Sequence, residues 1–249
     1  MLFGTDGLGI QFSNMHDAQF IGMIALCVIL FSGGMSTRVS AIRPVLGPGL
    51  VLSTAGVLLT ALITGGFIFW LSGMPWTNIH FALIPSLLLA STMSSTDSAS
   101  VFGILGSQKV GLKHNIRPLL ELESGSNDPM AYMLTIILIE AATLGGDLSA
   151  GMLAGQLALQ FGAGGAMGFA MGYVVKHLAR AYLRIGRGKG KEDAGQATAM
   201  LSIMIIGAVF FTYTATTAVG GNGYLAVYIC GIVLGNMRLP HHRSITRFM

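Results

Sequence analysis

Seven long apolar stretches dominate the sequence and leave few folds open to it. They lie near residues 18–35, 44–72, 80–107, 117–145, 148–175, 195–219 and 223–239. Each has roughly the 20 residues that a helix needs to cross the hydrocarbon core of a bilayer. Charged residues make up only 10% of the chain, against about 25% in a typical soluble domain. The sequence therefore predicts an all-α, polytopic transmembrane helical bundle of about seven spans.

The positions of the Lys and Arg residues predict the orientation of the bundle. All of them follow the first, third, fifth or seventh stretch: Arg38, Arg43, Lys109, Lys113, Arg117, Lys176, Arg180, Arg184, Arg187, Lys189, Lys191, Arg238, Arg243 and Arg247. The other connections carry Asp6, Asp17 and Asp147 instead. This alternation is the positive-inside pattern. We therefore expect a multi-pass protein of the cell (inner) membrane with its N-terminus outside and its C-terminus in the cytoplasm, and no nucleic-acid partner.

The third stretch contains an acid in the middle of a predicted helix. The segment ASTMSSTDSASVFG (90–103) has eight Ser, Thr or Asp residues among its fourteen. Ser and Thr can bond to their own helix backbone at little cost. A charged Asp at the centre of a spanning helix, however, costs about 2.5–3.5 kcal/mol. We therefore expect Asp97 to face the protein interior or a water-filled cavity, and to be functional.

The fourth stretch begins with three acids in ELESGSNDPM (121–130). Residues three and four apart share a helix face, so Glu121, Ser124 and Asp128 are expected on one side. Glu123 points about 140° away from Asp128 at about 100° per residue, and it needs a different partner.

Two features indicate ion binding beside Asp128. Pro129 has no N–H, which leaves the carbonyl of Gly125 without its usual donor. Carboxylate and carbonyl oxygens suit a hard cation. Asp128 also lies eleven residues after the basic loop near 107–117, and Asp97 lies ten residues before it. At 1.5 Å per residue both carboxylates are expected roughly 15 Å from the cytoplasmic end, where they can form one joint site near the midplane.

Three further patterns have structural explanations. The two cysteines lie inside apolar stretches and are expected to be small core thiols, without a disulfide or a metal. The fifth stretch repeats small residues every four positions, which predicts close helix packing. The segment VGGNG (219–223) predicts a tight turn. The residues of the first two patterns are Cys27, Cys230, Gly164, Gly168 and Gly172.

The segment SSTDSASVFGILGSQKVGLKHNIRPLLELESGSNDPM resembles the core of the NhaP-type monovalent cation:proton antiporters, the bacterial K⁺/H⁺ or Na⁺/H⁺ exchangers of the cation:proton antiporter 1 family. LFSGGMSTRVSAIRPVLGPGLVL (30–52) and GGNGYLAVYICGIVLGN (220–236) look like flanking helices of that family. The resemblance covers essentially the whole chain. It implies a single transmembrane domain of the sodium/hydrogen exchanger type over residues 1–249. This domain is expected to be incomplete, because family members have more helices on both sides.

The resemblance also implies ion ligands. Thr96 and Asp97 match the family's Thr-Asp pair in a discontinuous, crossing helix, here expected around 91–100. Asp128 matches the aspartate that binds cation and proton in turn, and Ser124 matches a hydroxyl ligand one turn away. Asp128, Thr96 and Ser124 are thus the expected ligands of a monovalent cation.

Two neighbouring residues have other implied roles. Asn127 matches the asparagine that marks the Asn-Asp branch of the family, which is associated with electroneutral exchange. Glu123 matches a glutamate that forms a structural ion pair with an arginine on a later helix. That helix would lie beyond Met249.

The expected activity is secondary transport without a cofactor other than the transported cation and proton. Asp128 would hold either a proton or K⁺ or Na⁺ in an alternating-access site, in a protein that contacts membrane lipid and forms a homodimer. Three alternatives stay open: an intramembrane aspartyl protease using Asp97 and Asp128, a cation channel, and a non-functional antiporter fragment. The GxGD element of intramembrane aspartyl proteases is absent here, and SGSND stands in its place.

Overall fold

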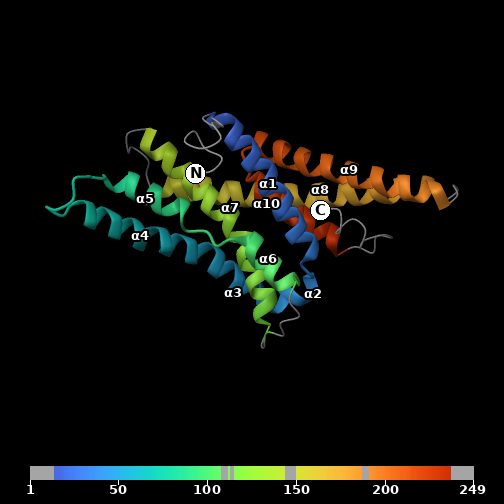
Figure 1. Cartoon of the computed structure of the whole chain (residues 1–249), viewed down its shortest axis with the longest axis horizontal. Helices are drawn as coiled ribbons and strands as arrows, with labels where there is room; N and C mark the ends of the chain where they lie inside the picture. The colour runs from blue at the N-terminus through green and yellow to red at the C-terminus, as the bar shows by residue number, and fades with distance from the viewer. Residues whose placement is uncertain (1–13, 108–111, 113–114, 144–149, 187–190, 237–249) are drawn as a thin grey trace, which may run out of the picture.

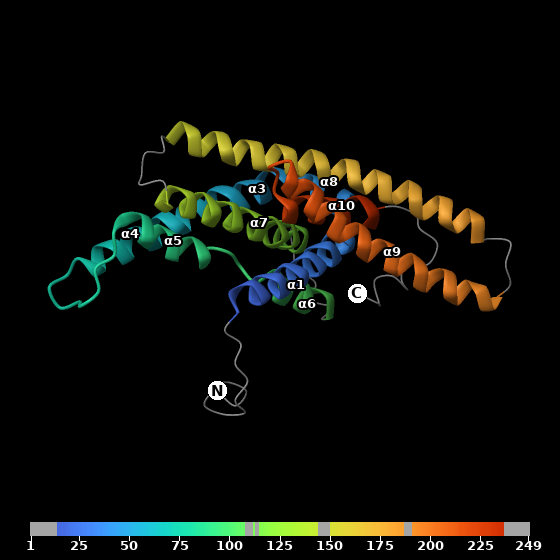
Figure 2. The same ribbon diagram turned by 90° about the horizontal axis from the view of Figure 1, so that it is seen from above.

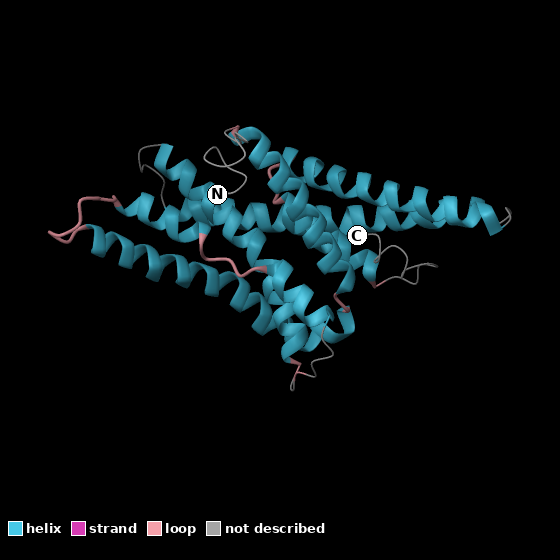
Figure 3. Ribbon diagram, in the orientation of Figure 1, coloured by secondary structure: helices cyan, strands magenta, loops and turns pink. Residues whose placement is uncertain are grey.

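The computed structural model describes residues 14–107, 112, 115–143, 150–186 and 191–236, and the regular elements of these ranges are all helical (Figure 3). The helices are α1 (Met15–Ser36), α2 (Val39–Ile42), α3 (Leu46–Val51), α4 (Val57–Ser72), α5 (Leu83–Thr92), α6 (Ser98–Ser107), α7 (Ile116–Thr143), α8 (Ala150–Gly186), α9 (Lys191–Ala218) and α10 (Gly223–Gly235). A 3₁₀ turn η1 (Arg43–Val45) and a π-helical turn η2 (Leu52–Gly56) join α2, α3 and α4 into one helical run. The all-α prediction is confirmed for this part of the chain.

Four helical segments in the described ranges are long and apolar enough to cross a membrane, judged by length and composition: Met15–Ser36, Val39–Ser72, Ala154–Tyr182 and Met200–Ala218. The apolar helices Leu83–Thr92 and Gly223–Gly235 are shorter. Each of the seven stretches expected from the sequence contains helix within the described residues. The number of spans stays a prediction, because α7 combines spanning length with a polar first half.

The helices form two packed groups, and α7 contacts both. Helices α1, α8, α9 and α10 share one apolar core that includes Leu30, Val209 and Tyr228. Both cysteines are free and buried in this core, as predicted. Helices α4, α7 and α8 meet around a second core that includes Val57 and Met133. In Figures 1 and 2, α4 and α5 lie side by side as a hairpin at one end, and the long helices α8 and α9 extend at the other.

Helix α10 lies at the centre of the first group, between α1 and α8 (Figure 2). A Cβ atom added to Gly164, Gly168 or Gly172 of α8 would lie 2.7–2.8 Å from the nearest atom of the segment 222–233. The small residues therefore let α8 and α10 approach closely, which confirms the expected packing. A Cβ atom at Gly231 of α10 would similarly lie 2.5 Å from the backbone oxygen of Phe31 in α1.

One expected helix boundary is found and another differs. The third apolar stretch is interrupted between α5 and α6, at residues 93–97, in agreement with the discontinuity expected around 91–100. The loop crosses the middle of the molecule in Figure 3. The fifth stretch, expected to end near residue 175, continues as helix to Gly186, because its basic residues can remain helical after leaving the apolar region.

Candidate ion-binding site

The interruption between α5 and α6 is produced by polar residues that bond locally. Asp97 directly precedes α6, and its carboxylate accepts hydrogen bonds from the backbone N–H (3.2 Å) and the hydroxyl of Ser100. A carboxylate that bonds the third backbone N–H of a helix is a favourable N-cap. Ser94 also bonds the carbonyl of Ser91 at 2.7 Å, at the end of α5. These bonds satisfy backbone groups that a continuous helix would have paired.

The carboxylate of Asp128 lies against the loop of this interruption and the start of α6. The hydroxyl of Ser95, which belongs to the loop, donates to Oδ1, and the hydroxyl of Ser98, the first residue of α6, donates to Oδ2 at 2.5 Å. One carboxylate oxygen thus has a hydroxyl donor from the loop, and the other has a donor from the start of α6. Hydrogen bonds to a charged acceptor are among the strongest in proteins.

A second set of polar contacts surrounds Asn127, which is 1% exposed. Its amide nitrogen donates to the Thr96 hydroxyl and, at 2.9 Å, to the Glu123 carboxylate. The Thr96 and Ser124 hydroxyl oxygens lie 3.4 Å apart. Asn127 therefore holds the polar part of α7 against the loop and supplies a partner for Glu123 four residues earlier.

A cavity of about 390 Å³ opens beside these groups. Its lining includes Asp128, Ser95 and Ser98, together with Asp97 and the apolar residues Leu26 and Ile29 of α1. A largely apolar cavity with a few converging polar groups is the usual form of a small-ligand site. Its polar atoms are carboxylate and hydroxyl oxygens, which are ligands for hard cations.

The structure brings most of the residues expected from the sequence into one place. Asn127, Thr96, Ser124 and Glu123 are linked by the hydrogen bonds given above. The Ser95 hydroxyl, which bonds Asp128, also lies 3.2 Å from Asn127 Oδ1 and so connects Asp128 to this set. Asp97 lines the same cavity as Asp128, but its side chain is exposed and its bonds go to its own helix. Among the described residues no hydrogen bond joins the two carboxylates. The joint site of two aspartates therefore stays a prediction.

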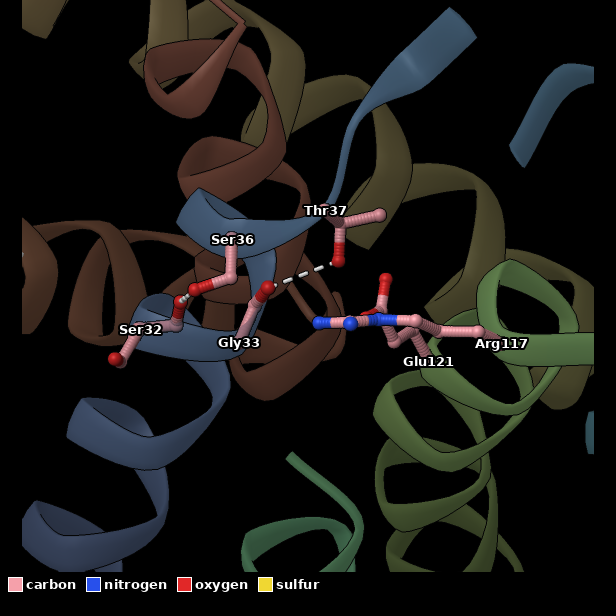
Figure 4. Close-up of polar contacts among 6 residues, drawn as sticks. All are labelled: Ser32, Gly33, Ser36, Thr37, Arg117 and Glu121. Atoms are coloured by element: carbon pink, nitrogen blue, oxygen red, sulfur yellow. Dashed lines mark hydrogen bonds and ion pairs between the residues drawn. The ribbon is translucent and has the colours of Figure 1, made fainter. Parts of the chain in front are cut away.

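Glu121 lies outside this cluster. Its carboxylate pairs with the Arg117 guanidinium at 2.9 Å in the first turns of α7. Figure 4 shows this pair beside the end of α1, where Ser36 and Thr37 donate hydroxyl bonds to the carbonyls of Ser32 and Gly33. The pair is a local contact between residues four apart on one helix.

Sequence reasoning missed Ser95 and Ser98 as neighbours of Asp128. Both belong to the Ser- and Thr-rich segment 90–103, where every hydroxyl has an inexpensive local explanation. Their selection depends on how α6 approaches α7, and the sequence spacing contains no signal for that approach.

An all-helical, multi-pass membrane protein with an interrupted helix and a partly buried, oxygen-rich site has the features of a secondary transporter. The comparison with known proteins gives the family. Residues 1–249 match the family described as "Sodium/hydrogen exchanger, transmembrane", and the chain belongs to this family. It is a family of cation:proton antiporters, which are transporters and not enzymes, so the aspartyl-protease alternative is not supported.

Several relatives are named as antiporters. The chain is 37% identical over 99% of its length to the K(+)/H(+) antiporter NhaP of Alkalimonas amylolytica, of which it covers 40%. It is 35% identical over 95% of its length to the K(+)/H(+) antiporter NhaP2 of Shewanella oneidensis, of which it covers 38%. The chain therefore spans about two fifths of the length of these relatives.

The fold is similar to a solved antiporter. The sodium proton antiporter MjNhaP1 from Methanocaldococcus jannaschii matches 92% of this chain with a TM-score of 0.65 and 22% identity, and the match covers 52% of the antiporter's chain. The NhaP-type resemblance expected from the sequence is confirmed.

Proposed function

We propose that the protein exchanges a monovalent cation, K⁺ or Na⁺, for H⁺ across the cell membrane, and that cation and proton compete for Asp128. The observation that carries this proposal is the pairing of the two Asp128 oxygens with the hydroxyls of Ser95, inside the helix interruption, and Ser98, at the start of α6. This arrangement puts one ionisable group beside the non-helical segment between two helices, where neighbouring hydroxyls can change partners.

The chemistry of the hydroxyl group supports competition. A Ser hydroxyl has one donor and two acceptor lone pairs. Towards an ionised, cation-free Asp128 the hydroxyls of Ser95 and Ser98 act as donors. When a cation enters, the same hydroxyls can turn their oxygens toward it, and Thr96 and Ser124 offer two more oxygens nearby. A proton on Asp128 removes the negative charge that the cation needs, so the two ligands exclude each other.

Potassium is the favoured cation. The relatives from Alkalimonas amylolytica and Shewanella oneidensis, both named as K(+)/H(+) antiporters, match at least 95% of the chain. The Na(+)/H(+) antiporter NhaP of Pseudomonas aeruginosa matches 48% of the chain at 30% identity. Asn127 next to Asp128 supports electroneutral exchange on the pattern of the family.

The proposal includes the orientation of the protein in the membrane and the helix movement that alternates access to the site. We place the protein in the inner membrane, surrounded by lipid, with the N-terminus of this segment outside and its C-terminus in the cytoplasm, because the basic residues alternate between connections. Access would alternate when the group containing α4–α7 rocks against the group formed by α1, α8, α9 and α10. Assembly as a homodimer is part of the same proposal.

The test compares two acids of α7. The first assay uses everted membrane vesicles from cells that express the protein from its natural gene, and a pH dye reports proton movement after K⁺ is added. In the second assay the purified protein is titrated with KCl while the released protons are measured. Asp128→Asn should abolish both signals. The control Glu140→Gln should retain them, because Glu140 bonds Gln156 of α8 at 2.9 Å, away from the cavity. Proton movement or release that persists in Asp128→Asn refutes the assignment.

The same vesicles separate an antiporter from a channel. A channel lets the cation equilibrate without moving protons. An antiporter moves protons in proportion to the cation and stops when either is absent.

A further inference from the structure

Helix α10 and its N-terminal cap contact α7 along one stripe of residues in the part of α7 that carries the candidate ion site. The Tyr228 hydroxyl donates to the Glu121 carbonyl at 3.3 Å. A Cβ atom at Gly125 would lie 2.5 Å from the Tyr228 ring. The Asn222 amide donates to the Pro129 carbonyl at 3.0 Å. Residues 121, 125 and 129 are four apart, so the three contacts follow one face of α7.

Asn222 is the most heavily bonded residue of this contact, and it is 2% exposed. Its backbone N–H donates to the Gln160 carbonyl of α8 at 3.1 Å. Its side-chain oxygen accepts from the Leu225 N–H at 2.9 Å and so caps the start of α10. Its side-chain nitrogen makes the bond to Pro129. One asparagine therefore connects α7, α8 and α10 and uses both ends of its amide.

Asn222 reaches α7 at a turn where that helix lacks one backbone hydrogen bond. Pro129 has no N–H, so the carbonyl of Gly125 cannot receive the bond that normally joins these turns. Asp128 precedes Pro129 directly. Neighbouring residues of a helix are about 100° apart and turn together when the helix rotates about its axis. A rotation of α7 against α10 would therefore also move Asp128 relative to Ser95 and Ser98.

We propose that Asn222 is a positioning residue of the ion site: its side-chain amide holds the Pro129 carbonyl and thereby sets where Asp128 lies against the hydroxyls of Ser95 and Ser98. The inference rests on the proposed competition of cation and proton for Asp128. Under this proposal, a turn that looks purely structural in the sequence directly affects the affinity for the cation.

The experiment compares the asparagines at the two ends of α10. Asn222→Ser keeps a good N-cap for Leu225 but is too short to reach Pro129. Asn236→Ser is the control: the Asn236 side chain bonds the Thr37 carbonyl and the Val39 N–H, both at 2.8 Å, and does not bond α7. The purified full chain is titrated with KCl at constant pH, and the midpoint of proton release is measured beside the melting temperature.

We expect Asn222→Ser to raise the KCl midpoint about two- to tenfold, the factor that one net hydrogen bond represents. Asn236→Ser should lower the melting temperature and leave the midpoint unchanged. An unchanged midpoint in Asn222→Ser, or an equal shift in both variants, overturns the proposal and shows a merely structural role. If Asn222→Ser does not fold, Asn222→Gly replaces it, because Gly is also accepted at an N-cap and has no side-chain donor.

The control proteins separate this inference from the function on which it rests. If wild type releases no protons, or Asp128→Asn releases as many as wild type, the proposed function fails. If wild type and Asp128→Asn behave as expected but the Asn222 variants keep the KCl midpoint of wild type, the positioning role alone is refuted.

Discussion

Replacing Gly125 by Ala tests the closest approach between α7 and α10. The added methyl group would lie 2.5, 2.6 and 2.8 Å from the Tyr228 atoms Cε2, Cζ and Oη. The ring cannot move aside easily, because Tyr228 is 1% exposed and its hydroxyl bonds the Glu121 carbonyl. The helix or the ring must therefore shift. Overpacking of this kind costs about 1–3 kcal/mol.

The control Gly66→Ala removes the contribution of helix propensity. Ala is about 1 kcal/mol more favourable than Gly inside a helix, and this gain applies to both positions. A methyl group at Gly66 in α4 would meet nothing within 4 Å. The difference between the two variants therefore equals the overpacking cost of about 1–3 kcal/mol, or roughly 2–12 °C in Tm for a chain of this size.

The assay is thermal unfolding of the purified protein in detergent. We expect Gly66→Ala to raise Tm and Gly125→Ala to lie about 2–12 °C below it. In a Tyr228→Leu background the two substitutions should behave alike, because the ring that occupies the space is gone. If Gly125→Ala stabilises the unmodified protein as much as Gly66→Ala does, then α10 does not approach α7 in this way.

Two further predictions concern the interrupted helix. Ser95→Ala and Ser98→Ala should each raise the KCl midpoint of proton release by about tenfold or more, because each removes a hydrogen bond to a charged group worth about 1.5–3 kcal/mol. The control Ser100→Ala, whose hydroxyl bonds Asp97 and not Asp128, should leave the midpoint near that of wild type, and equal shifts in all three contradict the site. Asp97→Asn should keep Tm, since Asn caps a helix as well as Asp does, and should raise the midpoint by less than about tenfold because an exposed charge is screened by water. Complete loss of proton release in Asp97→Asn would instead show that Asp97 binds the cation directly.

The regular geometry of a helix explains which parts of the site were predictable. Asp128, Asn127, Ser124 and Glu123 belong to one continuous segment, and their relative directions follow from 3.6 residues per turn. The placement of Glu123 away from Asp128 and the need for another partner followed from the same rule. Its observed partner, Asn127, lies four residues along the helix.

The contacts between helices were not predictable in the same way. Ser95 and Ser98 could not be separated from the other hydroxyls of the segment 90–103, because their bonds to Asp128 join residues about thirty positions apart. Asn222 looked like an ordinary turn residue for the same reason, since Pro129 is 93 positions away.

The sequence by itself determined the membrane environment of this protein, its helical class and the segment that carries Asp128. These follow from the length of apolar runs and from the cost of placing charge in hydrocarbon, which depend on each segment alone. Only the tertiary structure decided which hydroxyls meet Asp128, and that α10 holds α7 at Pro129. Those contacts depend on the closeness of packed helices, which small residues allow at many positions and side-chain fit selects at one.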